Sequence, residues 1–277
     1  MTDHEGHAPG RTDAPGRTDA PGRTDAQGRP ADSAGQAWAG KTIPSHGFAG
    51  DVGEADAALG SALEANRSEP TPETEEVLLT HVAAARWLVP VVAVATEVDD
   101  SGEHAVDTRS DMAVVTLTSP DDGTRALPMF TSLAELARWD ASARPVPVTA
   151  AAAAQAAIGE ECQILLVDVA SDHATALRPS MLWALAQERA WQPAHHDQHV
   201  ARAVAEAVRG EDAVTAHELG AGEPAGAGVL KIVLHLQPGL AEVDVAAVAT
   251  RIGERIASDG ETRARIDALT FALEAAT

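Results

Sequence analysis

The sequence predicts an α+β fold of two small layered units, with mostly antiparallel or mixed sheets and flanking helices, behind a disordered N-terminal tail. Three observations lead to this prediction. Short β-branched and apolar runs alternate with turn residues, capped helical segments lie between these runs, and the first 36 residues contain almost nothing apolar. The predicted domains are a tail at 1–36, an extended arm at 37–68, an α+β domain at 69–194 and a smaller α+β domain at 195–277.

The tail repeats the six residues APGRTD three times in succession, at 8–25. Glycine, proline and charged residues cannot bury enough apolar surface to offset the entropy cost of ordering, so we expect this segment to be disordered. In the arm that follows, we expect Trp38, Ile43 and Phe48 to pack across the folded domain.

The segment from Gly35 to Thr42, GQAWAGKT, matches the phosphate-binding pattern G-x-x-x-x-G-K-[ST]. Phosphate binding by this pattern requires a buried strand before the loop and a helix after it, so that backbone N–H groups meet the phosphates. Because a polar tail precedes the loop and Pro44 follows it, we interpret the match as accidental. A nucleotide-binding switch that depends on Lys41 is nevertheless kept as the least favoured functional hypothesis, after the two that are given at the end of this subsection.

The larger domain is predicted to begin with a helix at Thr71-Pro72-Glu73, which combines a cap, a proline at the first helical position and an acid. Leu78 and Val82 lie on one face of this helix. Residues 86–95 are almost continuously apolar, which predicts a strand buried on both faces. A polar connection at 97–110 follows.

The stretch 111–139 contains the strongest local signals of the chain. Pro128 lacks the N–H that a sheet ladder needs, so its strand should lie at an edge or carry a bulge. Ser132 begins a capping box that opens a short helix. The predicted order is a strand at 112–117, a turn at 119–123 with Asp-Gly at the reversal, a strand at 126–131 and the Ser132 helix.

The rest of the larger domain continues to mix helices and strands. Residues 145–148 alternate proline and valine, which predicts another edge segment. Thr149 caps an alanine-rich helix that ends near Gly159. Further elements are a buried strand at 163–169, a strand at 174–177 that pairs with it, and a helix from Arg178-Pro179-Ser180.

The smaller domain is predicted to have the order α-β-β-α-β. Val200, Val204 and Val208 recur every four residues, which predicts a helix that ends at Arg209-Gly210. The run 229–236 alternates between two faces, which is typical of a half-buried strand in an antiparallel sheet. One face carries Leu230, Ile232, Leu234 and Leu236, and the other carries Val229, Lys231, Val233 and His235. The other elements are a strand at 213–217, a helix with Val245, Val248, Ile252 and Ile256 on one face, and a closing strand with Leu269, Phe271 and Leu273.

Composition excludes two classes of partner. The formal net charge is −22, and Lys and Arg together number 20. Nucleic-acid binding needs a basic face that neutralises phosphates, and an anionic membrane would repel this chain, so we expect neither partner. Cys162 is the single cysteine, which suits a reducing compartment, and the N-terminus lacks the apolar core of a signal peptide. We therefore expect a soluble, cytoplasmic protein.

Three segments carry a resemblance to a known family: ALPMFTSLAELARWD at 126–140, ARWLVPVVAV at 85–94 and GFAGDVGEADAAL at 47–59. They are similar to the SseB family of actinobacterial type, which carries the SseB N-terminal domain and is named for enhanced serine sensitivity. The resemblance covers most of 37–277 and is strongest over 77–150. It implies a cytoplasmic α+β protein without an established reaction, and so it assigns no active-site residues.

His195, His196 and His199 form the one cluster of the sequence with metal-ligand character. If residues 195–199 are helical, His195 and His199 lie one turn apart and can face one metal ion, although a third ligand from elsewhere is still required. Two other interpretations are a polar interdomain linker and a pH-sensitive interdomain contact.

Three further residues are candidates for a role. We expect Cys162 to be a buried apolar side chain, because no base or helix N-terminus that would activate its thiol lies nearby in the sequence. Trp191 is expected at a domain–domain or subunit contact. Pro128 is expected on an edge strand that a second copy can use.

These observations favour a non-enzymatic binding or regulatory module that needs no cofactor and associates with an unknown protein partner or a small metabolite. A homo-oligomer through the Pro128 edge strand is one form of such association. The alternative is a metal-binding sensor or an enzyme that uses the cluster of His195, His196 and His199.

Overall fold

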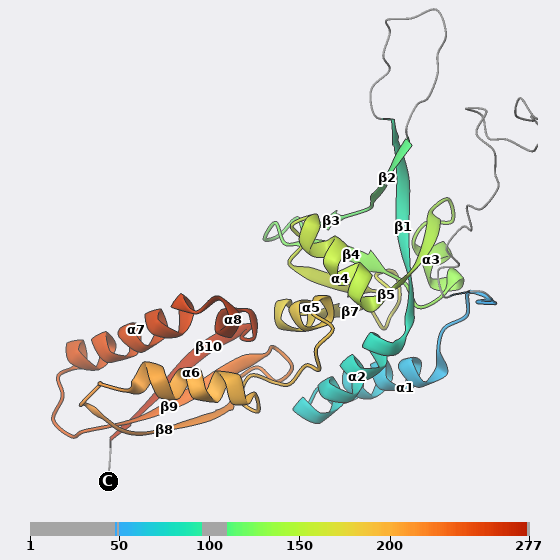
Figure 1. Cartoon of the computed structure of the whole chain (residues 1–277). Helices are drawn as coiled ribbons and strands as arrows, with labels where there is room; N and C mark the ends of the chain where they lie inside the picture. Colours follow the sequence, from blue (N-terminus) through green and yellow to red (C-terminus); the bar gives the residue numbers. More distant parts are fainter. Residues whose placement is uncertain (1–47, 49, 96–109, 276–277) are drawn as a thin grey trace, which may run out of the picture. The chain divides into compact units, whose positions relative to one another are not determined.

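The computed structural model describes residue 48 and residues 50–95 and 110–275, all within the compact unit His46–Thr277. The repeats at 8–25, the segment at 35–43 and the connection at 97–109 lie outside the described residues. The described part combines helices with mixed and antiparallel sheets, which confirms the predicted α+β class (Figure 1).

Two large hydrophobic clusters organise the described chain, and they share no residue. The first collects buried side chains between residues 59 and 186, with Trp191 packed against it. The second collects buried side chains between residues 200 and 256, with partly buried neighbours as far as Phe271. We call the parts built around them the N-terminal lobe (residues 57–191) and the C-terminal lobe (residues 194–275).

The N-terminal lobe begins with a helix where the sequence analysis places an extended arm. The expectation for residues 37–68 is wrong over α1 (Ala57–Ser68). The Asp56 carboxylate accepts a hydrogen bond from the N–H of Leu59 at 2.8 Å, so it caps the helix. Leu59 and Leu63 are buried, and this burial against the core holds α1 in place.

The next helix, α2 (Pro72–Ala84), begins as the sequence predicts. The Thr71 hydroxyl accepts from the N–H of Thr74 at 3.2 Å, while the Thr74 hydroxyl accepts from the N–H of Thr71 at 2.9 Å. These reciprocal bonds satisfy two N–H groups that the helix cannot satisfy itself. Leu78, Leu79 and Val82 form its buried face.

Two sheets lie in the N-terminal lobe. The first has the order β2-β1-β5 and is antiparallel; the second has the order β3-β4-β6-β7, with β4 and β6 parallel. Their strands are β1 (Arg86–Ala95), β2 (Ser110–Val114), β3 (Leu117–Thr118), β4 (Arg125–Met129), β5 (Arg144–Thr149), β6 (Ile164–Val167) and β7 (Thr175–Leu177).

The predicted hairpin around the 119–123 turn is much shorter than expected. Only Leu117 and Thr118 pair with β4, whereas residues 110–114 pair with β1 in the other sheet. The run that reads as one strand is therefore divided between two sheets. Strand periodicity does not show this division, because both halves are equally apolar.

Pro128 does not lie on an edge strand, so this prediction is wrong. β4 lies between β3 and β6, and Pro128 is buried. The Met129 carbonyl accepts from the N–H of Asp168 on the β6 side, whereas the N–H of Phe130 donates to Leu88 on the opposite side. The backbone nitrogen of Pro128 therefore points to the same side as that of Phe130. On that side β3 has already ended, so no N–H donor is needed there.

The helices of the N-terminal lobe carry the predicted caps. Ser132 caps α3 (Leu133–Trp139) by accepting from the N–H of Glu135, and Thr149 caps α4 (Ala150–Gly159). Four alanines of α4 are buried and allow the helix to approach the sheet closely. The last helix of this lobe is α5 (Pro179–Ala186).

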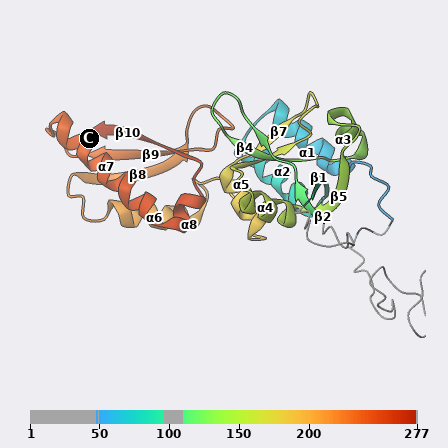
Figure 2. The same cartoon turned by 90° about the horizontal axis from the view of Figure 1, so that it is seen from above.

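The C-terminal lobe has the predicted order of elements plus one short helix. In its sheet, with order β10-β9-β8, β9 is antiparallel to β8 and parallel to β10. The helices cover one face of this sheet (Figure 2), and Leu230, Ile232 and Leu234 point into that interface. The elements are α6 (Gln198–Val208), β8 (Val214–Ala221), β9 (Val229–Leu236), α7 (Glu242–Ser258), α8 (Gly260–Ala264) and β10 (Ala268–Ala275).

β5 is an edge strand, as its prolines predict, and the register shows why they suit this place. Leu88 exchanges both backbone hydrogen bonds with Phe130, so its partner in β5, Pro147, turns its backbone nitrogen outward. Pro145 stands two residues away and has the same orientation. Two successive outward positions therefore carry no N–H group, which blocks pairing of this edge with another strand.

We expect the double substitution Pro145→Thr/Pro147→Thr to promote self-association, because it adds two outward N–H donors to an exposed strand. Sedimentation velocity should show a larger species that increases with concentration. Pro120→Thr, in the exposed turn between β3 and β4, removes a proline without changing an edge and should leave the distribution unchanged. The same distribution for the double variant and the wild type would contradict this role of the prolines.

Candidate functional site

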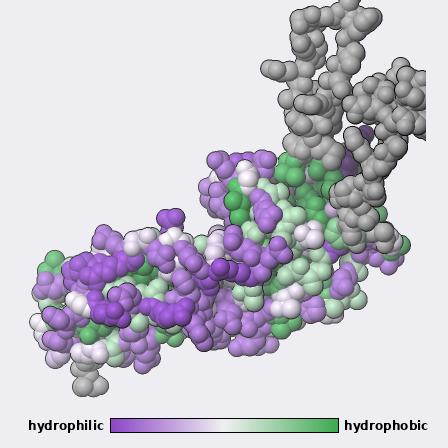
Figure 3. All heavy atoms as spheres, viewed as in Figure 1, coloured by the Kyte–Doolittle hydropathy of each residue, from purple (hydrophilic) through white to green (hydrophobic). Residues whose placement is uncertain are grey.

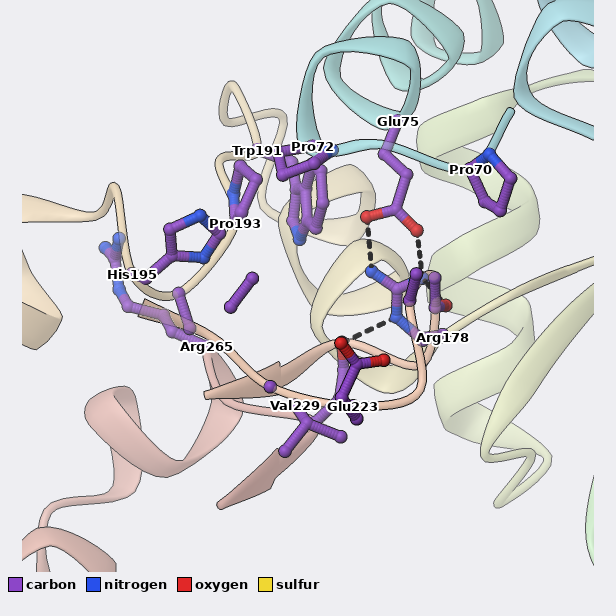
Figure 4. Close-up of a pocket in the computed structure, with 17 residues that line it drawn as sticks. Pro70, Pro72, Glu75, Arg178, Trp191, Pro193, His195, Glu223, Val229 and Arg265 are labelled. Carbon is purple, nitrogen blue, oxygen red and sulfur yellow. Dashed lines mark hydrogen bonds and ion pairs between the residues drawn. The ribbon is translucent and has the colours of Figure 1, made fainter. Parts of the chain in front are cut away.

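A cavity of about 130 Å³ lies beside the start of α5, between segments that are distant in the sequence (Figure 4). Pro70, Pro72 and Glu75 line it from the α2 side, and the loop at 221–229 lines it from the C-terminal lobe. The other lining residues are Arg178, Trp191, Pro193, Ala194, His195, Arg265 and Asp267.

Arg178, directly before α5, is the centre of this site. Its guanidinium holds both oxygens of Glu75, at 2.5 and 2.9 Å, and donates from Nε to Asp267 at 2.9 Å. It also donates to the carbonyl of Gly226 at 2.7 Å. Burial opposes the charge of Arg178, but the hydrogen bonds and charges of Glu75 and Asp267 outweigh it and raise the pKa of Arg178 above its usual value.

Asp267 supplies the cap that α5 lacks in its own sequence. The residue at the cap position is Arg178, whose side chain makes no capping bond. Instead, the Asp267 carboxylate accepts from the N–H and the hydroxyl of Ser180, both at 2.8 Å. A carboxylate at a helix N-terminus is stabilised by the free N–H groups and the helix dipole. A residue of the C-terminal lobe therefore completes a helix of the N-terminal lobe.

Trp191 connects this cavity with a second, larger hollow. Its indole N–H donates to the Ser180 hydroxyl at 2.9 Å, and the Arg178 guanidinium carbon lies 5.7 Å from the ring centroid. On its other side Trp191 lines a groove of about 610 Å³, which we call the Trp191 groove. The groove is also lined by Glu76, Leu79, Thr80, Ala83, Thr149, Ala151, Leu185, Glu188, Arg189, Ala190 and Gln192.

A second set of contacts joins the lobes near the cavity. Arg189 makes an ion pair with Glu261 at 2.9 Å, and the guanidinium carbon of Arg265 lies 5.0 Å from the ring centroid of Trp183. Arg265 is held in turn by Asp197 at 2.6 Å. The join between the lobes thus depends on ion pairs, hydrogen bonds and stacked guanidinium groups.

The structure does not bring His195 and His199 together. Residues 194–196 form a turn and α6 starts at Gln198, so 195–199 is not one helix. The His199 ring lies 3.0 Å from the Thr262 hydroxyl and 3.5 Å from Asp259, whereas His195 packs on His196 beside α2. The assumption behind the predicted metal pair is therefore wrong.

The environment of His195 favours an uncharged ring. Burial and the neighbouring His196 lower the pKa of His195 below its usual value. Among the described residues, no group of three or more His, Cys, Asp or Glu side chains is arranged to hold a metal ion.

Cys162 is buried, as the sequence predicts, and burial raises the pKa of its thiol. Asp168 is also buried, at the end of β6, with the left-handed φ of 47°. Its carboxylate accepts from the N–H and the hydroxyl of Thr131, at 2.9 and 2.7 Å. Burial nevertheless raises the pKa of Asp168 above its usual value.

The sequence indicates a contact role for Trp191 but not for the residues around it. Arg178 and Ser180 are predicted only to start a helix, and no role is predicted for Asp267. The one local signal is that α5 has proline at its first position but no Ser, Thr, Asp or Asn before it. Such a helix start needs a cap from elsewhere, and sequence alone does not identify a donor 87 residues away.

The described residues therefore define an α+β protein with two separate cores and a polar cavity where they meet. Residues 59–184 match the model described as the SseB protein N-terminal domain, so this part of the chain contains a domain of the SseB N-terminal type. The match runs from α1 into α5 and so covers most of the N-terminal lobe. Comparison with curated proteins and with solved structures gave no match.

None of the helices in the described ranges has the length and apolar character that crossing a membrane requires. The visible surface over α6 and α7 is largely hydrophilic, and the darkest regions mark the most polar residues (Figure 3).

We expect Arg178→Ala to lower the free energy of unfolding by about 3 kcal/mol, because it leaves the buried Glu75 and Asp267 carboxylates without their cation. Urea denaturation followed by tryptophan fluorescence measures the change. The control is Arg67→Ala, since Arg67 pairs with Glu64 on the surface of α1 and both side chains are about half exposed. Its loss should cost clearly less than the loss of Arg178, because water screens this exposed pair. Equal costs for the two variants would show that the Arg178 pairs contribute no special stability.

Proposed function

We propose that this protein is a non-enzymatic, cytoplasmic binding module that receives a small metabolite or a short segment of a partner protein in the Trp191 groove. The observation that carries the proposal is the position of Trp191, which lines both the groove and the Arg178 cavity. Tryptophan is enriched among the residues that dominate binding energy, because it buries a large surface and keeps a polar edge.

The size and chemistry of the groove support this choice. Its volume of about 610 Å³ falls within the range of ligand sites, whereas the cavity of about 130 Å³ holds only a very small group. Leu79 and Leu185 are apolar lining residues, Glu76 and Glu188 add negative charge, and the positive charge of Arg189 is already paired with Glu261. This combination favours a ligand with an apolar part and a neutral or positive polar part.

The use of the buried charges favours binding over catalysis. Both oxygens of Asp168 accept hydrogen bonds from Thr131. Glu211 makes ion pairs with Arg251 at 2.6 Å and with Arg255 at 2.9 Å. Hydrogen bonds from Arg251 lower the pKa of Glu211, which keeps it charged in its ion pairs. A carboxylate that ion pairs keep charged, such as that of Glu211, is not poised to donate a proton.

The groove can be tested by filling it. Ala83 lines the groove and is exposed, so we expect Ala83→Trp to remove the thermal stabilisation that any groove ligand gives. A panel of free amino acids, other small metabolites and short basic peptides is screened by thermal shift with the full chain. Compounds that raise Tm of the wild type should not raise Tm of this variant.

Ala84→Trp is the matched control, because Ala84 is the next residue of α2, is exposed and does not line the groove. It should respond as the wild type does. Mass spectrometry of the bound compound then separates binding from turnover. Stabilisation that persists in Ala83→Trp, or recovery of the compound in a chemically altered form, would contradict the proposal.

A further inference from the structure

The two lobes have separate apolar cores, so their contact does not depend on a shared hydrophobic interior. Hydrogen bonds and ion pairs across it join Asp267 to Arg178 and Ser180, the Gly226 carbonyl to Arg178, and Glu261 to Arg189. Interfaces of this kind resemble those of reversible complexes, in which relative motion of the parts is the default. The folding of each lobe and their docking are thus separate equilibria.

Within this contact Asp267 has the largest share of bonds. Its side chain is 8% exposed and accepts from the Nε of Arg178, the N–H of Ser180 and the hydroxyl of Ser180. Arg178 keeps its bidentate pair with Glu75 inside the N-terminal lobe, so its position does not depend on Asp267. Arg178 and Ser180, which we call the socket, therefore stay in place when Asp267 is released.

The same socket is linked to the wall of the Trp191 groove. The Ser180 hydroxyl accepts from the indole N–H of Trp191 and donates to Asp267. Arg189, which also lines the groove, is held by Glu261 of the C-terminal lobe. Arg189 is thus fixed by a bond that exists only while the lobes are docked, whereas Trp191 is linked to the docked state through the Ser180 hydroxyl, which Asp267 also binds.

We propose that the contact of Asp267 with Arg178 and Ser180 is a reversible latch, through which docking of the C-terminal lobe sets the shape of the Trp191 groove. The latched state holds Trp191 and Arg189 in the positions described above. The released state frees Arg189 and removes the Asp267 bond from the Ser180 hydroxyl that holds Trp191, so a groove ligand that prefers one arrangement shifts the docking equilibrium. The coupling to a ligand rests on the proposed function, whereas the latch itself does not.

Gly228 offers a way to open the latch without removing any of its groups. Its φ is +71°, and an added Cβ would lie 2.5 Å from both Arg178 Nε and Asp267 Oδ2. Gly239 has a φ of +88° and no neighbour within 4 Å of an added Cβ. Gly228→Ala and Gly239→Ala therefore share the backbone strain of an alanine with positive φ. Only Gly228→Ala also places a methyl group between Arg178 and Asp267.

Docking is measured in the full chain by the distance between two spin labels, at Val77→Cys in α2 and Val243→Cys in α7. Both positions are exposed, and one lies on each lobe. The latched wild type should give one narrow distance distribution. Gly228→Ala should broaden it and raise the ratio of released to docked molecules by at least about tenfold, which is the effect expected from losing one strong polar contact. Gly239→Ala should match the wild type.

Circular dichroism confirms that each variant is folded, and Asp267→Asn is the second variant if Gly228→Ala does not fold. It keeps the shape of the side chain and removes its charge, so it should broaden the distribution in the same direction. Unchanged distributions in folded Gly228→Ala or Asp267→Asn would overturn the latch.

The ligand arm of the experiment separates the two proposals. A compound whose binding is lost in Ala83→Trp should change the ratio of released to docked molecules. If release occurs but no compound binds the groove, the latch stands and the proposed function fails. If a groove compound binds without changing the distribution, the coupling is overturned and the proposed function stands.

Discussion

The structure depends on one buried cation held between two carboxylates. Arg178 joins Glu75 of α2 to Asp267 of the C-terminal lobe, and all three side chains are at most 16% exposed. A buried charge without a partner is costly, so Arg178 stabilises both carboxylates in their buried positions. Asp267 also binds the Ser180 hydroxyl, which in turn accepts from the indole N–H of Trp191. The same group of charges therefore influences the start of α5, the cavity and the groove.

This group of charges explains how two lobes with separate cores form one compact unit. Apolar burial stabilises each lobe but contributes little between them, because the two hydrophobic clusters share no described residue. The hydrogen bonds and ion pairs between the lobes are directional, so they define one relative geometry. Each adds little net stability, because a bond to water is exchanged for a bond to protein.

Local chemistry made much of the fold predictable. Thr71, Ser132 and Thr149 all cap helices where the sequence indicates, and the alternation in β9 correctly gives its buried face. The failures arise where a partner distant in sequence decides the outcome. Pro128 is tolerated inside a sheet because β3 ends before it would need the missing N–H group. Residues 110–114 pair with β1, although their sequence suits the hairpin equally well. For the site, Trp191 was accessible to sequence reasoning, but its connection to Asp267 exists only in three dimensions.

The cap that Asp267 gives to α5 has a consequence for the order in which the protein is made. Ser180 leaves the ribosome 87 residues before the carboxylate that satisfies its N–H group. Until then the nascent N-terminal lobe carries an incomplete helix end and an Arg178 with only one of its two acids. Domains generally fold as units during synthesis, N-terminal first, so this lobe forms its core early and receives its final bonds late. The growing chain thus passes through a stage in which the socket is open, and the C-terminal lobe closes it as the last step of assembly.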